Sequence, residues 1–286
     1  MSVQQKSFFH EPTSTVTYLV WDEATGAAAV IDPVLDYEPR GAKVSGGQAS
    51  EILRFLKDHG LNLAYVLETH AHADHLSAAA RLREATGAQV VIGAHITAVQ
   101  DYFGKVFGAA DVAPDGAVFD RLVQEGDTLM LGETAIGVLH TPGHTPACVT
   151  YLIDGAAYVG DTLFMPDYGT ARADFPGGDA ATLYRSIQKI LALPPETRIF
   201  VGHDYLTETR KTHAWETTVA AQAAENIHLR DGVSEADFVA RREARDANLP
   251  PPVLILPSLQ VNIRAGALPP PAADGRVYLR LPVTVT

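Results

Sequence analysis

The sequence predicts an α/β fold in which two mixed β-sheets stack face to face, with helices covering both outer faces, an αββα arrangement. Short apolar strands alternate with helical patterns as far as residue 92. Closely spaced strands with turn signals then fill residues 118–160, and one more helix and strand follow before residue 205. A doubly wound parallel sheet would need crossover helices within the strand-only stretch, so the sandwich accommodates this order better.

The first half alternates strands and helices. Its predicted strands are residues 15–21, 27–32, 63–68 and 89–92, of which the first two flank the turn-forming segment DEATG and predict a hairpin. Residues 48–60 place their apolar side chains on one face and end at Gly60, which predicts a helix. Residues 75–86 are rich in Ala and Leu with Gly87 as a C-cap, so we expect a second helix there.

The second half begins with strands alone and ends in helices. The segments FDRLV, TLMLG, TAIGVLH, CVTYLI and AAYVG predict a mostly antiparallel sheet. An amphipathic helix over residues 180–193 stops at two prolines, and residues 198–201 form another strand. Beyond residue 205 we expect helices over residues 215–230 and 234–247, followed by an irregular tail. The predicted division is therefore a core of residues 1–205 and C-terminal helices and tail, residues 206–286, packed on it.

Composition excludes several classes of protein. Lys and Arg number 22 against 34 Asp and Glu, a net charge of −12, and no basic run could neutralise a line of phosphates. Nucleic acid and membranes are therefore not expected partners. The first 16 residues carry no signal-peptide pattern, and the single cysteine, Cys148, fits a reducing compartment, so we expect a cytoplasmic protein. Cys148 is expected to be a small core residue.

A dense group of metal-ligand residue types follows the strand at residues 63–68. His70, His72, Asp74 and His75 fall within six residues, at the point where that strand gives way to the next helix. Alternate side chains of such a turn can aim at one point, and the first helical turn approaches it from the other side. Polar turn residues with Asp74 as an N-cap are the plain alternative. Burying three imidazoles and a carboxylate without a metal would be costly, so we expect a metal site.

Three later residues are candidates to complete this site. His144, Asp161 and His203 each follow an apolar strand, where side chains are held by rigid elements yet face a cleft. Each one alone is more simply a surface or hydrogen-bonded residue, but their joint order favours a shared centre. The other histidines, His10, His59, His95, His140, His213 and His228, have no partners at such spacing and are expected to be structural or exposed.

The motifs HAHADH, PGHT, GD and GHDY, in this order, are similar to the pattern of the metallo-β-lactamase superfamily over residues 15–205. That resemblance implies two metal-ligand groups. One would consist of His70, His72 and His144, and the other of Asp74, His75 and His203, with Asp161 bridging the two.

A closer resemblance involves LHTPGHTPACVTYL, GDTLF, ARADF, GGDAATLYRSI, GHDY and NIRAG, which look like the persulfide dioxygenases, including their bacterial β-lactamase-like hydrolase homologues. It implies one Fe(II) per chain held by His70, His144 and Asp161, a set that leaves coordination positions open. The implied reaction is oxidation of glutathione persulfide by O₂ to sulfite, with release of glutathione, in sulfide detoxification. The remaining residues would hold waters or orient the ligands: His72, Asp74, His75 and His203.

The same resemblance implies that Thr145, Arg172 and Tyr205 bind the substrate. The guanidinium of Arg172 could bind a glutathione carboxylate, whereas its plain alternative is a surface salt bridge. The sequence departs from the family in two places. The link LFMPDYGTA between Asp161 and Arg172 is longer than its equivalent, and Ala265 stands where some members carry a cysteine.

Two other functions compete with this one. A hydrolase of glutathione thioesters, resembling glyoxalase II, would use all seven ligands to hold two Zn or a mixed Fe/Zn pair. Against it stand the ARADF and NIRAG segments and the lack of an evident basic cluster in the C-terminal helices. A non-enzymatic scaffold would be expected to have lost a ligand, and none is lost. The metal's identity and the oligomeric state, for which a homodimer is one possibility, stay open.

Overall fold

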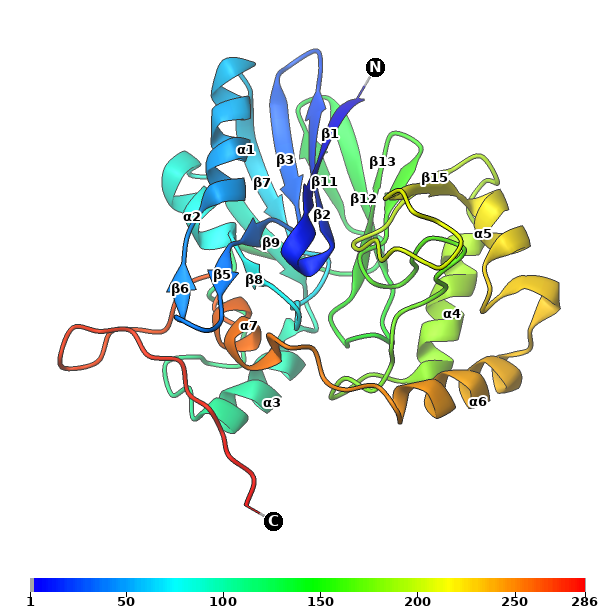
Figure 1. Ribbon diagram of the computed structural model, residues 1–286. Helices are drawn as coiled ribbons and strands as arrows, with labels where there is room; N and C mark the ends of the chain where they lie inside the picture. The colour runs from blue at the N-terminus through cyan, green and yellow to red at the C-terminus, as the bar shows by residue number, and fades with distance from the viewer. Residues whose placement is uncertain (1–2, 286) are drawn as a thin grey trace.

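The computed structural model describes residues 3–285 and contains two six-stranded β-sheets that pack face to face, as predicted (Figure 1). The first sheet has the order β1 (Val3–His10), β2 (Thr15–Asp22), β3 (Ala27–Ile31), β7 (Asn62–Leu67), β9 (Gln89–Gly93), β10 (Arg121–Val123). The second has the order β11 (Thr128–Leu131), β12 (Thr134–His140), β13 (Val149–Ile153), β14 (Ala156–Tyr158), β15 (Arg198–Phe200), β16 (Glu216–Thr218).

Both sheets are mixed. In the first, β1, β2 and β3 pair antiparallel, and β3, β7, β9 and β10 pair parallel. In the second, every pair is antiparallel except β14 with β15. Two short ribbons lie beside the sheets: β4 (Val34–Leu35) with β8 (Leu76–Ser77), and β5 (Tyr37–Glu38) with β6 (Lys43–Val44). The strand-only stretch of sequence thus forms the antiparallel part of the second sheet, except for its first segment. FDRLV, which was predicted to belong to that sheet, instead forms β10 and pairs parallel with β9 at the edge of the first sheet.

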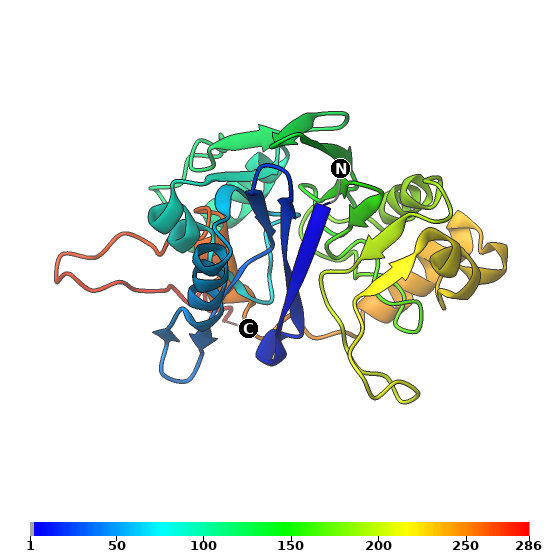
Figure 2. The same cartoon turned by 90° about the horizontal axis from the view of Figure 1, so that it is seen from above.

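Helices cover both outer faces of the sandwich, as Figure 2 shows from above. The helices on the first sheet's side are α1 (Gly47–Asp58), α2 (Ala79–Thr86), α3 (Ile96–Phe107) and α7 (Ile255–Asn262). Those on the second sheet's side are α4 (Ala180–Leu191), α5 (Val219–Glu225) and α6 (Glu235–Asp246). None of the helices found in residues 3–285 has the length and apolar character needed to cross a membrane.

The apolar core lies in three layers. Inward-facing side chains of the two sheets, such as Tyr18, Ile136 and Phe200, pack together between them. A second layer lies under the helices of the first sheet, and a third lies under those of the second. In α4, Leu183 and Ile187 are fully buried, and the Asp179 carboxylate accepts a hydrogen bond from Thr182 N–H at the helix N-terminus (2.7 Å).

The helix predicted at residues 75–86 begins later than expected. Leu76 and Ser77 pair with β4 as strand β8, and α2 starts only at Ala79. A hydrogen bond from Ser77 N–H to the side chain of Asn262 (2.8 Å) holds this segment extended. Asp74 and His75 therefore lie in a loop before β8 and not on the first turn of a helix.

Several further elements differ from prediction. The helix expected over residues 215–230 is replaced by β16 and the shorter α5, because the β-branched Thr217 and Thr218 pair with β15. The tail predicted to be irregular contains α7, whose Val261 is fully buried. Strand β1 and helix α3 were not assigned from sequence. The division at residue 205 stays a prediction, although β16 lies beyond it and completes the second sheet.

Candidate metal centre

The seven predicted ligand side chains converge from four loops. They come from the loop after β7, from the β12–β13 connection and from the segments that follow β14 and β15. Asp161 lies in the middle of this cluster. Its Oδ2 is 3.8 Å from His70 Nε2 and 3.7 Å from His144 Nε2, and its Oδ1 is 3.3 Å from His203 Nε2. His203 Nε2 is also 3.2 Å from Asp74 Oδ2.

The cluster contains buried polar atoms that lack a hydrogen-bond partner among the described residues. Each would cost about 1–3 kcal/mol if it stayed unsatisfied. Their close grouping therefore fits a bound cation, and nitrogen and carboxylate donors suit iron or zinc. These atoms are His70 Nε2, His72 Nδ1, Asp74 Oδ2, His75 Nε2, Asp161 Oδ1 and His203 Nε2.

Hydrogen bonds to the opposite ring nitrogen leave Nε2 of His75, His144 and His203 with a free lone pair. Nδ1 of His75 contacts the carbonyl oxygen of Leu76 (3.1 Å), and Nδ1 of His144 contacts that of Arg172 (2.8 Å). A carbonyl can only accept, so Nδ1 carries the hydrogen and Nε2 is free to bind a metal. Nδ1 of His203 donates in the same way to the carbonyl of Ser14 (3.3 Å).

His72 is oriented the other way round. Its Nε2 lies 3.1 Å from Asp32 Oδ1 and 3.2 Å from Glu68 Oε2, so it donates to these carboxylates and only Nδ1 can serve the centre. Burial lowers the pKa of His72, but the two carboxylates outweigh burial and raise it well above its usual value. Metal binding at Nδ1 would therefore release a proton.

Two groupings of ligand atoms share Asp161: the first is His70, His144 and Asp161, and the second is Asp74, Asp161 and His203. Within each group the ligand atoms lie within 4.8 Å of one another. His72 falls with Asp74 and His75, and separately with Asp32 and Glu68, and not with His70 and His144. The first group is the ligand set expected for a single iron.

Asp32, which was not predicted to belong to the site, holds residues of the metal centre in place through hydrogen bonds. It directly follows β3 in a left-handed conformation (φ 49°), a strained backbone geometry that is frequent at functional sites. Its carboxylate accepts hydrogen bonds from Thr69 N–H and Thr69 Oγ1. Burial raises the pKa of Asp32, but His72 and Thr69 outweigh burial and hold that pKa below its usual value.

Asn262 of α7 is a second residue whose role was missed. Its side-chain amide donates to the carbonyl oxygens of His72 and His75, both at 2.8 Å, and its Oδ1 accepts from Ser77 N–H. One side chain thus fixes the backbone of the ligand loop at three points. Asn262 belongs to the NIRAG segment, which contributed to the family resemblance. The sequence therefore showed the motif, but it did not show which backbone groups Asn262 contacts.

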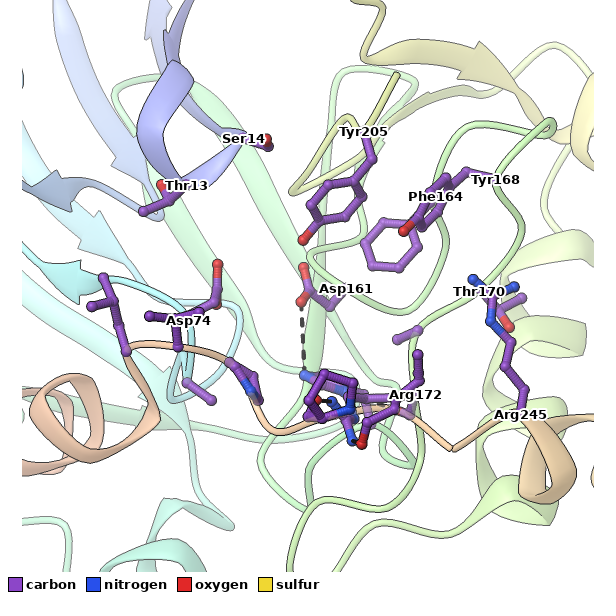
Figure 3. A pocket seen from close by; sticks show the side chains of 18 of the residues that line it. Thr13, Ser14, Asp74, Asp161, Phe164, Tyr168, Thr170, Arg172, Tyr205 and Arg245 are labelled. Atoms are coloured by element: carbon purple, nitrogen blue, oxygen red, sulfur yellow. Dashed lines mark hydrogen bonds and ion pairs between the residues drawn. The ribbon is translucent and has the colours of Figure 1, made fainter. Parts of the chain in front are cut away.

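A cavity of about 580 Å³ opens beside Asp161 and Asp74 (Figure 3). Its wall includes the aromatic side chains of Phe164, Tyr168 and Tyr205. Figure 3 shows the hydroxyl of Tyr205 pointing into the cavity toward Asp161. The Tyr205 ring stacks on the imidazole of His203, with centroids 5.7 Å apart. Such a volume is typical of small-molecule sites.

The three residues predicted to bind substrate are placed differently from one another. Tyr205 and Arg172 line the cavity, but Thr145 is fully buried and not part of its wall. The Thr145 hydroxyl lies 3.1 Å from Cys148 Sγ. Cys148 is buried, which raises its pKa to about 12 and agrees with a core role. The guanidinium of Arg172 is bound by Asp174 at 2.5 and 2.7 Å.

The C-terminal helices do present basic residues to this cavity, contrary to expectation. Arg242 and Arg245 of α6 both belong to its wall. They are three residues apart and therefore lie on the same face of the helix, a pattern that could have been read from the sequence RREAR. This removes one of the observations that counted against the glutathione thioester hydrolase.

Comparison with known proteins agrees with the fold. The family model of the metallo-β-lactamase superfamily matches residues 10–203. The "Probable metallo-hydrolase" of Burkholderia pseudomallei is 51% identical over 97% of this chain and 98% of its own length. The human mitochondrial persulfide dioxygenase ETHE1 is 32% identical, covering 93% of this chain and 90% of that protein.

Among solved structures, ETHE1 from Myxococcus xanthus is similar with a TM-score of 0.75 and 32% sequence identity, over 92% of this chain and all of that one. The fold and the clusters of His and Asp side chains support a metal cofactor and an enzymatic role. The family model covers two thirds of the chain, and the relatives include persulfide dioxygenases. This chain therefore belongs to the metallo-β-lactamase superfamily.

Proposed function

We propose that the protein is a cytoplasmic, Fe(II)-dependent persulfide dioxygenase that oxidises glutathione persulfide with O₂ to sulfite and glutathione, in sulfide detoxification. The observation that carries the proposal is the group formed by His70, His144 and Asp161 at the edge of the cavity. Similarity to persulfide dioxygenases over nearly the whole chain supports it.

The reaction balances with one added water. Glutathione persulfide, O₂ and water give glutathione, sulfite and two protons; the outer sulfur loses four electrons and the two oxygen atoms gain them. A bound Fe(II) would supply the redox chemistry that lets O₂ react with this sulfur. Two imidazoles and one carboxylate would hold the iron and leave positions open for both reactants.

The residues around His70, His144 and Asp161 orient these ligand side chains and form the walls of the cavity in which the substrate would react. Thr69 and Asp32 keep Nε2 of His70 unprotonated, and the backbone carbonyl of Arg172 does the same for His144. The aromatic side chains of Phe164, Tyr168 and Tyr205 make the wall apolar and reduce the water that competes for the site. We assign to the hydroxyl of Tyr205, which points into the cavity toward Asp161, a hydrogen bond to the substrate's reacting end.

We assign direct substrate contact to Tyr205. Thr145 and Arg172 act on the substrate site through the residues that they hold in position. The role predicted for the Arg172 guanidinium would require it to leave Asp174. Through its carbonyl, Arg172 instead orients His144. Thr145 contacts Cys148 next to β13 and stabilises the loop that carries His144. Asp74, His75, His72 and His203 would hold waters or orient the first three ligands.

A two-metal hydrolase of glutathione thioesters is the second candidate. The group formed by Asp74, Asp161 and His203 favours it, because it offers a second metal position that shares Asp161 with the first. The name of the Burkholderia relative, a probable metallo-hydrolase, agrees with this alternative. In that enzyme the metals would be zinc, or iron and zinc.

Oxygen uptake separates the two functions. Anaerobically iron-reconstituted protein should consume O₂ and release sulfite when glutathione persulfide is added, while zinc-loaded protein and the Asp161→Ala variant should not. An absence of uptake by fully loaded iron protein, together with hydrolysis of S-lactoylglutathione by the zinc form, would overturn the dioxygenase. We also propose that the protein forms a homodimer, which size-exclusion chromatography would test, and we propose no nucleic-acid or membrane partner.

A further inference from the structure

Three arginines line the cavity, and two of them are already neutralised by carboxylates. Arg172 forms a bidentate pair with Asp174. The buried Arg242 pairs with Asp246 at 2.6 Å and donates to the carbonyl of Thr170. Neither guanidinium is therefore free to bind an anion without losing an existing partner.

Arg245 is exposed and has no carboxylate partner among the described residues. Its closest polar contact is Nη1 to Nε2 of His228, at 3.1 Å. Its Cζ lies 5.8 Å from the centre of the Tyr168 ring, in a cation–π contact. Figure 3 shows Arg245 reaching from α6 along the cavity wall toward Thr170.

The contact between Arg245 and His228 brings two donors together. The backbone N–H of Thr170 donates to Nδ1 of His228 at 3.0 Å, so Nδ1 must carry the lone pair. Burial and the neighbouring arginines lower the pKa of His228 to about 4, so its ring is neutral at pH 7. The ring hydrogen is then on Nε2, facing Arg245 Nη1–H, and His228 cannot hold the guanidinium by accepting a hydrogen bond.

An aromatic wall connects Arg245 with the metal centre. Tyr168, beneath the guanidinium, lies 4.9 Å from the ring of Tyr205, and Tyr205 stacks on His203. A substrate with its sulfur beside Asp161 can therefore extend along this wall toward Arg245, a cation with no carboxylate partner among the described residues.

We infer that Arg245 binds a carboxylate of the glutathione portion of the substrate and so determines specificity for an acidic thiol persulfide. This inference rests on the proposed function, and it assigns to Arg245 the carboxylate contact that the family resemblance implied for Arg172. A planar guanidinium binds a carboxylate through two parallel hydrogen bonds, and the apolar wall beside it strengthens that pair.

The experiment compares Arg245→Gln with Arg241→Gln, which removes the same charge from the same helix but from a residue outside the cavity wall. Calorimetric titration of the metal-loaded proteins with glutathione should give a Kd about ten-fold or more weaker for Arg245→Gln. Arg241→Gln should match the wild type, and Arg245→Lys should restore part of the affinity. In oxygen uptake, Arg245→Gln should raise KM for glutathione persulfide and leave kcat near its original value.

Equal glutathione affinity of Arg245→Gln and Arg241→Gln would overturn the inference. If Arg245→Gln does bind glutathione more weakly, titration with the glycine monoethyl ester of glutathione identifies which glutathione carboxylate Arg245 contacts. If the ester binds both variants equally, Arg245 contacts the glycine carboxylate; if the difference persists, it contacts the γ-glutamyl carboxylate. Failure of the wild type to bind glutathione would instead overturn the glutathione-linked function itself, and this inference with it.

Discussion

The carboxylate of Asp32 accepts two hydrogen bonds from Thr69, one from the backbone N–H at 2.7 Å and one from the hydroxyl at 2.8 Å. Because the Thr69 hydroxyl donates its hydrogen to Asp32, it can only accept from His70 Nδ1, which lies 2.9 Å away. This relay keeps the hydrogen of His70 on Nδ1 and the lone pair on Nε2, beside Asp161. A strained residue that follows β3 thereby sets the protonation of a ligand on a different loop.

Replacing Thr69 by valine should weaken metal binding. The Thr69→Val variant keeps the shape of the side chain but removes the acceptor for His70 Nδ1, and loss of such a partner typically lowers metal affinity 10–100-fold. Competition with a chelator of known affinity measures the change. The matched control is Thr97→Val on α3, which should bind metal normally because the Thr97 hydroxyl donates to the carbonyl of Ala94, away from the metal centre. Unchanged affinity in Thr69→Val would refute the relay.

Replacing Asn262 by leucine should destabilise the ligand loop and the whole protein. The change removes three buried hydrogen bonds, to the backbone of His72, His75 and Ser77, and the free energy of unfolding should fall by about 1–3 kcal/mol or more. Denaturant unfolding and metal content are the measurements. Asn248→Leu removes an exposed hydrogen bond on the end of α6 and should leave both unchanged. Normal metal content in Asn262→Leu would show that α7 does not position the loop.

Removing His203 should distinguish one metal from two. If a single iron is held by His70, His144 and Asp161, the His203→Ala variant should keep about one iron per chain, because His203 belongs to the other group. Elemental analysis after anaerobic loading measures the stoichiometry. Asp161→Ala, which removes a member of both groups, should lose the metal. If the wild type instead binds two metal ions per chain and the His203→Ala variant binds only one, the result would favour the hydrolase.

Acid should destabilise the folded protein through His228. Its folded pKa of about 4 lies below the usual 6.5, so between these values the unfolded chain binds a proton that the folded protein excludes. The stability that depends on a neutral His228 is complete above pH 6.5 and is lost as the pH falls toward 4. Urea unfolding at pH 7 and pH 5 should show a smaller loss in His228→Asn, whose side-chain oxygen can still accept from Thr170 N–H.

The control for this pH effect is His59→Gln, which removes an exposed imidazole at the end of α1. Its loss of stability between pH 7 and pH 5 should equal that of the wild type. If His228→Asn also loses as much stability as the wild type, the neutral state of His228 does not contribute, and its contact with Arg245 must be reinterpreted.

Much of the fold was predictable because its signals are local. The hairpin of β2 and β3, the helices α1, α4 and α6, and the strand-only stretch follow from periodicity and turn residues within short windows. The predictions that failed involve long-range contacts. Residues 75–78 stay out of a helix because Asn262, near the far end of the chain, bonds to their backbone. Trp215 precedes a strand because β15 offers an edge for pairing.

The sequence by itself determined which side chains could hold a metal, because His70, His72, Asp74, His75, His144, Asp161 and His203 are of ligand types and follow apolar strands. Only the tertiary structure decided how they are grouped, which ring nitrogen each presents, and which neighbours support them. Asp32 and Asn262 carry no local signal of the contacts they make, and the RREAR pattern, which puts Arg242 and Arg245 on one helix face, does not show that this face meets the cavity. Their roles depend on hydrogen bonds and charges between segments that meet only after folding, and pairing over such separations leaves no periodic pattern in the chain.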